Sequence, residues 1–287
     1  MQTVTHRLME HPLLQLPKLQ QLAQRLAARG SVRAHNDQAA PDTSFNRAPD
    51  THKAHLKPEE AFQDIKKAKA WMSLLNVQRD PEYRALVDEV LDYVRPMVEP
   101  KDPGMHFRAG WIFVTSPGAV TPYHFDHEHN FILQIHGSKQ VNVWEPLDRQ
   151  VVTEEALELF HAKHSRELVV YDDSLQTRAH RFDLEPGMGG YMPSTAPHWV
   201  KNGDGVSITV SFTYFTDRIL RNKLLYRGNH KLRELGLSPR PVGASRVRDG
   251  VKHAALRAMQ RAQWALRGEK SGMPPGYEGS EYAKSNA

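Results

Sequence analysis

The chain has 287 residues, of which 39% are hydrophobic and 25% are charged, so it can bury a core and is neither collagen-like nor wholly disordered. It contains no cysteine, which excludes disulfides, thiolate zinc sites and cysteine nucleophiles. No apolar run approaches the roughly 18 residues of a membrane span. The N-terminus carries charges and prolines where a signal peptide needs an unbroken apolar run, so we expect a cytoplasmic protein.

The first part of the chain, residues 1–104, is predicted to form helices joined by a long loop. Leucines recur at helical spacing in the first helix, and Gly30 provides its end. A polar stretch with two prolines follows. Pro58 and two acidic residues then suit a helical first turn, and Asp80-Pro81-Glu82 begins another helix in the same way. The expected elements are helices over 11–29, 58–75 and 80–98 and a loop over 31–57.

From Phe107 the sequence changes to short runs of β-branched and aromatic residues separated by Gly and Pro. This spacing predicts a small antiparallel barrel or sandwich, which we assign to residues 105–217. After Asp217 the strands end, and residues 218–287 are expected to form a basic helical region with a disordered end. The expected strands contain WIFVT, FILQI, QVNVW, ELVVY, HRFDL and ITVSFTYF.

The residues that can carry chemistry concentrate after Gly118. Residues two apart on a β-strand point to the same side, so His124 and Asp126 share a face, and Asn130 is in phase with them if the strand continues. His127 and His129 fall out of phase. We expect these two histidines to face solvent or to lie at the mouth of the pocket.

One imidazole and one carboxylate need a third metal ligand from elsewhere in the chain. His198, just before the last predicted strand, is the best candidate, and His180 is the alternative. Two histidines and one carboxylate on one face of an iron ion form the facial triad of non-haem Fe(II) oxygenases. Gly137-Ser138 predicts a tight hairpin that returns Lys139 beside the strand just left, where it could pair with the far carboxylate of a 2-oxo acid. A structural His–Asp pair, a core histidine and a plain hairpin lysine are the alternatives.

The segment from Gly118 to Pro146 resembles the cupin-fold JmjC-type 2-oxoglutarate oxygenases, most closely the asparaginyl-hydroxylase (factor-inhibiting-HIF-like) branch. That family has T-P-x-H-x-D, an asparagine six residues after the histidine and a lysine fifteen residues after it. The resemblance covers residues 107–216 and implies a mainly β protein, in which N- and C-terminal helices flank a double-stranded β-helix (cupin or jelly-roll) core. The matching residues here are Thr121, Pro122, His124, Asp126, Asn130 and Lys139.

The resemblance also implies the cofactors, Fe(II) and the cosubstrate 2-oxoglutarate. Thr121 and Lys139 would bind the distal carboxylate of the cosubstrate, and Asn130 would lie near its keto-acid end. Where the family has an asparagine on the final core strand this chain has Ser211, so one cosubstrate contact is changed. The family's upstream tyrosine has no assigned counterpart. The metal ligands implied are His124, Asp126 and His198.

These features predict an Fe(II)- and 2-oxoglutarate-dependent dioxygenase that hydroxylates a C–H bond of a protein or peptide side chain or of a small molecule. Halogenation is disfavoured, because Asp126 occupies the position that would have to be vacated for a halide. One alternative is a non-catalytic cupin-like regulator that binds a metal or ligand and contacts nucleic acid through its basic tail. Another is a metal-dependent cupin of a different reaction type.

The C-terminal region holds the basic residues of the chain. The formal net charge is +5, with +11 in residues 218–270 and −6 in the rest. Residues 246–267 have helical periodicity, with a narrow stripe of Val, Ala and Leu from Val247 to Leu266. We expect this stripe to supply part of a homodimer interface, with the arginines lining the approach to the active site. Docking on the protein's own core, a membrane headgroup layer, nucleic acid or an acidic partner are the alternatives.

Overall fold

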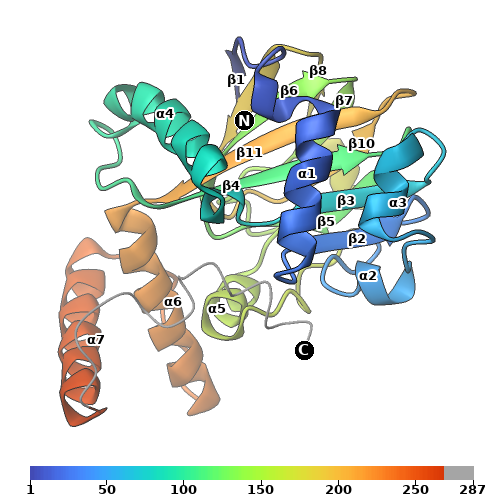
Figure 1. The fold of residues 1–287 in the computed structure, drawn as a ribbon. Helices are drawn as coiled ribbons and strands as arrows, with labels where there is room; N and C mark the ends of the chain where they lie inside the picture. Colours follow the sequence, from blue (N-terminus) through green and yellow to red (C-terminus); the bar gives the residue numbers. More distant parts are fainter. Residues whose placement is uncertain (268–287) are drawn as a thin grey trace.

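The computed structural model describes residues 1–267, and two antiparallel β-sheets form its centre (Figure 1). One sheet has seven strands in the order β1-β9-β6-β11-β4-β3-β2, and the other has four in the order β5-β10-β7-β8. From β4 onward every connection except that between β7 and β8 crosses from one sheet to the other, which is the winding of a jelly roll. The strands are β1 Gln2–Thr5, β2 Val32–Asn36, β3 Ala70–Leu74, β4 His106–Thr115, β5 Val120–His124, β6 His129–His136, β7 Lys139–Val143, β8 His180–Leu184, β9 Met188–Met192, β10 His198–Asn202 and β11 Ser207–Phe215. The expected double-stranded β-helix core is therefore confirmed.

The hydrophobic core lies on both faces of the seven-stranded sheet. Between the sheets, Ile132 and Met192 pack with Val141, Val143 and Val200 of the smaller sheet. The opposite face is covered by helices α1 and α4 (Figure 1). The leucines that α1 buries there are at most 1% exposed, so each contributes about 1.5–3 kcal/mol of burial. The helices are α1 Leu16–Ala27, α2 Ala48–Thr51, α3 Pro58–Ala61, α4 Pro81–Val98, α5 Glu154–Lys163, α6 Asp217–Glu234 and α7 Arg246–Arg267.

Two of the expected N-terminal helices are confirmed and the third is wrong. Helix α4 begins where its local signals predict, because the Asp80 side chain accepts a hydrogen bond from the Glu82 amide at 3.2 Å. Helix α1 ends before Gly30, whose φ of 64° a residue with a side chain rarely adopts. The predicted helix over 58–75 is wrong: the α-helix there, α3, ends at Ala61, and residues 70–74 form strand β3. All five residues of β3 are buried between β2 and β4, so sheet pairing overrides the local helical signal.

The N-terminal region contributes three strands to the larger sheet as well as helices. The expected loop over 31–57 is wrong where β2 pairs with β3. Strand β1 pairs with β9 at the other edge of the sheet. The first 104 residues are therefore built into the same sheet as the core strands. The domain boundaries at residues 104 and 217 stay a prediction.

The segment between β7 and β8 differs from its prediction. The ELVVY run is not a strand. It follows α5 as a turn that leaves Leu168 and Val170 exposed, at 53% and 67%. The predicted helix over 246–267 is confirmed as α7, whereas the expected disordered end lies outside the described residues. None of the helices in residues 1–267 combines the length and apolar character that a bilayer span requires.

Candidate metal centre and its cavity

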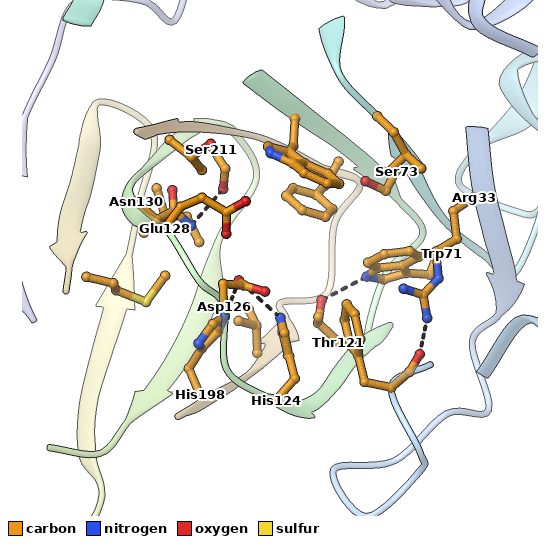
Figure 2. Close-up of a pocket in the computed structure, with 18 of the residues that line it drawn as sticks. Arg33, Trp71, Ser73, Thr121, His124, Asp126, Glu128, Asn130, His198 and Ser211 are labelled. Atoms are coloured by element: carbon orange, nitrogen blue, oxygen red, sulfur yellow. Dashed lines mark hydrogen bonds and ion pairs between the residues drawn. The ribbon is translucent and has the colours of Figure 1, made fainter. Parts of the chain in front are cut away.

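Three of the predicted ligands meet at one point. His124 ends β5 and His198 begins β10, and these two residues are direct partners in the antiparallel pairing of the strands. Asp126 follows in the turn between β5 and β6, and its Oδ2 lies 3.6 Å from His124 Nε2 and 3.8 Å from His198 Nε2 (Figure 2). One donor atom from each of the three lies within 4.8 Å of the others, and the described chain holds no other such cluster. The spacing fits one metal ion between them.

Hydrogen bonds fix the orientation and the tautomer of the two histidine rings. His124 Nδ1 lies 2.7 Å from the Pro122 carbonyl oxygen, and His198 Nδ1 lies 3.0 Å from that of Ala196. A carbonyl only accepts, so each Nδ1 carries the proton and each Nε2 presents a lone pair to the centre of the cluster. Burial, with the neighbouring His198, holds the pKa of His124 well below its usual range, which keeps the ring neutral. This donor set suits a divalent transition metal such as Fe(II).

The carboxylate of Asp126 is held from outside the barrel. Arg166, in the segment after α5, places Nη2 3.2 Å from Asp126 Oδ1 and donates from Nε to the Phe125 carbonyl oxygen at 3.1 Å. Its guanidinium lies against the rings of Phe160 and Phe45, with its carbon 4.7 and 5.2 Å from their centres. Arg166 therefore engages one carboxylate oxygen, and the other is directed toward the histidines.

The cavity above the triad contains every residue that the sequence assigned to the cosubstrate. Thr121, Asn130, Lys139 and Ser211 all line it. Asn130 Nδ2 donates to Ser211 Oγ at 3.3 Å, so these two polar side chains lie together on β6 and β11 (Figure 2). Several buried polar atoms in the lining have no hydrogen-bond partner among the described residues, and a bound polar ligand would satisfy them. Asn130 Oδ1, Ser73 Oγ and Thr213 Oγ1 are among them.

Lys139 reaches the cavity by a different route from the one predicted. Strand β6 pairs with β9 and β11, and β7 pairs with β8 and β10, so the turn at Gly137 crosses between sheets and the expected hairpin is wrong. Lys139 is 5% exposed, and its Nζ lies 5.9 Å from the centre of the Phe113 ring. Burial lowers its pKa to about 7, and no carboxylate of residues 1–267 pairs with it. Its position thus favours an anionic ligand.

Residues before 104 complete the cavity, which no motif in that region predicted. Arg33 of β2 and Trp71 of β3 line it, and Phe45 stacks on the His124 ring with centres 3.8 Å apart. Trp71 Nε1 donates to Thr121 Oγ1 at 2.8 Å (Figure 2). No local spacing links these residues to the triad, because Arg33 and Trp71 lie on the larger sheet, Phe45 lies in the loop after β2, and the two histidines of the triad lie on the smaller sheet.

Glu128 is a cavity residue that the sequence could have revealed. The alternation from which residues 124, 126 and 130 were predicted to share one side also includes Glu128, and its carboxylate points into the cavity (Figure 2). Burial raises the pKa of Glu128 to about 7, and the nearby charge of Asp126 acts in the same direction.

The expected exposure of His127 and His129 is wrong, since they are 5% and 3% exposed. His127 stacks on Phe160 of α5, and burial holds its pKa well below the usual range. His129 Nε2 lies 3.1 Å from Asp102 Oδ2. Both are out of phase with His124, as expected. They are nevertheless buried, because α5 covers His127 and the segment that contains Asp102 covers His129. The alternative ligand His180 lies on β8 with a 58% exposed side chain, away from the triad.

A jelly roll that holds two histidines and one carboxylate around a buried cavity defines a metal-binding protein of the cupin type. The family model described as "Cupin-like domain" matches residues 15–218. The chain therefore belongs to the cupin-like domain family. The family match does not distinguish the asparaginyl-hydroxylase branch, which stays a prediction.

The fold is similar to that of several solved structures. The ribosomal oxygenase YcfD from Escherichia coli, in complex with cobalt and 2-oxoglutarate, is 17% identical over 92% of this chain and 63% of that chain, with a TM-score of 0.45. The DMSP lyase DddQ from Ruegeria pomeroyi is 12% identical over 38% of each chain, with a TM-score of 0.24. This chain spans less than two thirds of the YcfD chain. No curated protein matches the sequence.

Proposed function

We propose that the protein is an Fe(II)- and 2-oxoglutarate-dependent dioxygenase that hydroxylates a C–H bond of a protein or peptide side chain or of a small molecule. The observation that carries the proposal is Lys139, a buried lysine without a carboxylate partner in the cavity that also holds the triad. A buried ammonium group is stabilised by a paired anion. A ligand with one carboxylate for Lys139 and a metal-chelating group at its other end fits both features.

The residues of the triad would hold iron through two neutral imidazoles and one carboxylate oxygen, which leaves coordination positions for a chelating keto acid and for dioxygen. Bound iron supplies oxygen activation coupled to oxidative decarboxylation of the keto acid. The overall reaction converts R–H, O₂ and 2-oxoglutarate into R–OH, succinate and CO₂. One oxygen atom enters the product and the other enters succinate.

The chain's own side chains would orient the cosubstrate. Thr121 Oγ1 already accepts a hydrogen bond from Trp71, so its hydroxyl hydrogen is available to donate to the distal carboxylate that Lys139 pairs with. Asn130 and Ser211 lie together near the opposite end of the cavity and would contact the keto-acid end. Phe45 and Trp71 cover one side of the cavity and restrict the access of water to it.

Succinate formation tests the proposal directly. The full-length protein with Fe(II), ascorbate and 2-oxoglutarate should release succinate even without a substrate, and a screened pool of peptides and small molecules should then show a product 16 Da heavier. A protein that binds the metal and 2-oxoglutarate but releases no succinate would instead be a non-catalytic binding module. A cytoplasmic location and a homodimeric state belong to the same proposal and rest on the sequence.

A further inference from the structure

Helices α6 and α7 form a hairpin that extends away from the two sheets at the end of the described chain (Figure 1). Leu256 of α7 packs on Gly228 of α6, which holds the two helices together. Most other residues of α7 are exposed. The hairpin therefore presents an extended surface that the rest of residues 1–267 leaves open.

One edge of the hairpin is basic. Arg246, Arg257 and Arg261 fall within about 60° of one another around α7 at 3.6 residues per turn, and all three are exposed. Burial lowers the pKa of His253, and the charges of Arg221 and Arg257 act in the same direction, which places Arg221 of α6 on this side as well. These four arginines are called the basic edge below.

The acidic residues of the hairpin are engaged elsewhere. Asp217 Oδ1 lies 2.8 Å from His106 Nε2, and Glu234 accepts a hydrogen bond from Lys163 at 2.9 Å. Asp249 is buried, and its carboxylate accepts a hydrogen bond from a backbone amide at 2.8 Å. Within the described part of the chain, none of the hairpin's acids therefore neutralises the basic edge.

The composition and the length of the basic edge favour phosphate groups in a row. Ten of the fourteen cationic residues in 218–270 are arginines, and the planar guanidinium group binds phosphate oxygens in pairs. From Arg246 to Arg261 the helix rises about 22 Å, a length over which one strand of a duplex carries about six phosphates. A helix that lies in a membrane surface instead buries large apolar side chains, whereas the apolar stripe of α7 is narrow and rich in alanine.

We propose that the basic edge binds the sugar-phosphate backbone of a nucleic acid. The surface lies outside the cavity, so the proposal does not depend on the dioxygenase assignment. It also does not use the apolar stripe of α7, which is assigned to the dimer. Contacts to phosphates carry no base specificity, so binding of mixed sequences is expected, with dissociation constants of about 10⁻⁴ to 10⁻⁶ M.

Fluorescence anisotropy of short labelled duplexes tests this with the full-length protein, with DNA and RNA as separate probes. The dissociation constant of the wild-type protein should rise steeply from about 50 mM to about 200 mM salt, because each arginine that pairs with a phosphate releases a counterion. In the triple variant Arg246→Ser/Arg257→Ser/Arg261→Ser, binding at low salt should be about tenfold weaker, and the slope against salt should fall by about three.

The matched control is Arg7→Ser/Arg29→Ser/Arg84→Ser, which removes the same charge from exposed positions in the first 104 residues and should bind like wild type. A Co(II) titration checks that both triple variants remain folded, since the metal triad precedes α6.

The same affinity in the two triple variants would overturn the proposal. A wild-type protein that binds neither duplex, or binds them independently of salt, would also overturn it without any variant. Phosphatidylserine vesicles and polyglutamate are the probes for a membrane surface and for an acidic protein. Tighter binding of either one than of the duplexes would assign the basic edge to that partner instead.

Discussion

Arg166 Nη2 lies 3.2 Å from Asp126 Oδ1, while Asp126 Oδ2 is turned toward the two histidines of the triad. The arginine comes from the segment between β7 and β8 and is held by an Asn46 side chain at 3.2 Å and by two flanking phenylalanine rings. A guanidinium on one oxygen fixes the carboxylate so that a single oxygen faces the metal position. Arg166 is therefore a positioning residue for the metal ligand.

Replacing Arg166 should weaken metal binding. Loss of an outer-shell partner typically costs about ten- to hundredfold in metal affinity, so we expect that decrease in Co(II) affinity for Arg166→Met. The Co(II) absorption spectrum should also change, because Asp126 is free to rotate. Arg166→Lys keeps the charge but not the planar fork and should recover only part of the affinity. The control is Arg178→Met, which breaks an ion pair with Asp148 in the same segment, distant from the triad. Equal Co(II) affinities in Arg166→Met and Arg178→Met would refute the role.

Each ligand of the triad should be indispensable for metal binding. We expect His124→Ala, Asp126→Ala and His198→Ala to lose more Co(II) affinity than the roughly ten- to hundredfold caused by an outer-shell change. All three should also abolish succinate formation. His180→Ala should match wild type, since this histidine is exposed on β8. Calorimetric titration of the four variants checks the assignment, and full Co(II) affinity in His198→Ala would show that the third ligand is wrong.

The affinity for 2-oxoglutarate should depend on pH through Lys139. Burial lowers the pKa of this ammonium group to about 7 in the free protein, so it loses its proton as the pH rises through that value. Only the protonated form attracts the carboxylate, so the dissociation constant should rise about tenfold between pH 6 and pH 8 at saturating Co(II).

Variants at position 139 separate this effect from other titrations. Lys139→Met should weaken 2-oxoglutarate by roughly ten- to hundredfold at pH 6 and remove the pH dependence. Lys139→Met should also raise the melting temperature of the ligand-free protein, because a buried charge without a partner is removed. The exposed Lys201→Met is the matched control. If the dissociation constant for 2-oxoglutarate is the same in Lys139→Met and wild type, another cation binds the carboxylate of the cosubstrate.

Helix α7 should mediate self-association. Val247, Val251 and Leu266 are 76%, 68% and 88% exposed, and Leu256 packs on Gly228 of α6. An exposed apolar stripe of this kind suits a second copy of the helix. We expect a homodimer by light scattering for the full-length chain and a monomer for Val247→Glu/Val251→Glu and for a chain lacking residues 246–287. Co(II) binding should persist in both, since every proposed ligand precedes α6.

The salt dependence distinguishes a dimer from docking on a polyanion. Apolar association should survive above about 0.2 M salt, whereas attraction between the basic helices and nucleic acid should weaken steeply. A full-length chain that is monomeric at both low and high salt would contradict the dimer.

Features that depend on neighbours along the chain could be predicted without the structure. His124, Asp126 and Asn130 were assigned to one side from the alternation of extended backbone, and all three line the cavity although residues 125–128 separate two strands. The start of helix α4 could be predicted because its cap, Asp80, lies within three residues of the amide that it accepts from. The winding of the core followed from the resemblance of one contiguous segment.

Contacts between segments that are distant along the chain became known only from the folded arrangement. Residues Ala70–Leu74 form a strand rather than the predicted helix, because they pair with strands on both sides. Lys139 reaches the cavity because the chain crosses between the sheets before β7, rather than through a hairpin. Arg33, Trp71 and Arg166 join the triad across long stretches of chain. Sheet pairing and packing select such partners by shape and charge in three dimensions, and these leave no periodicity in a single sequence.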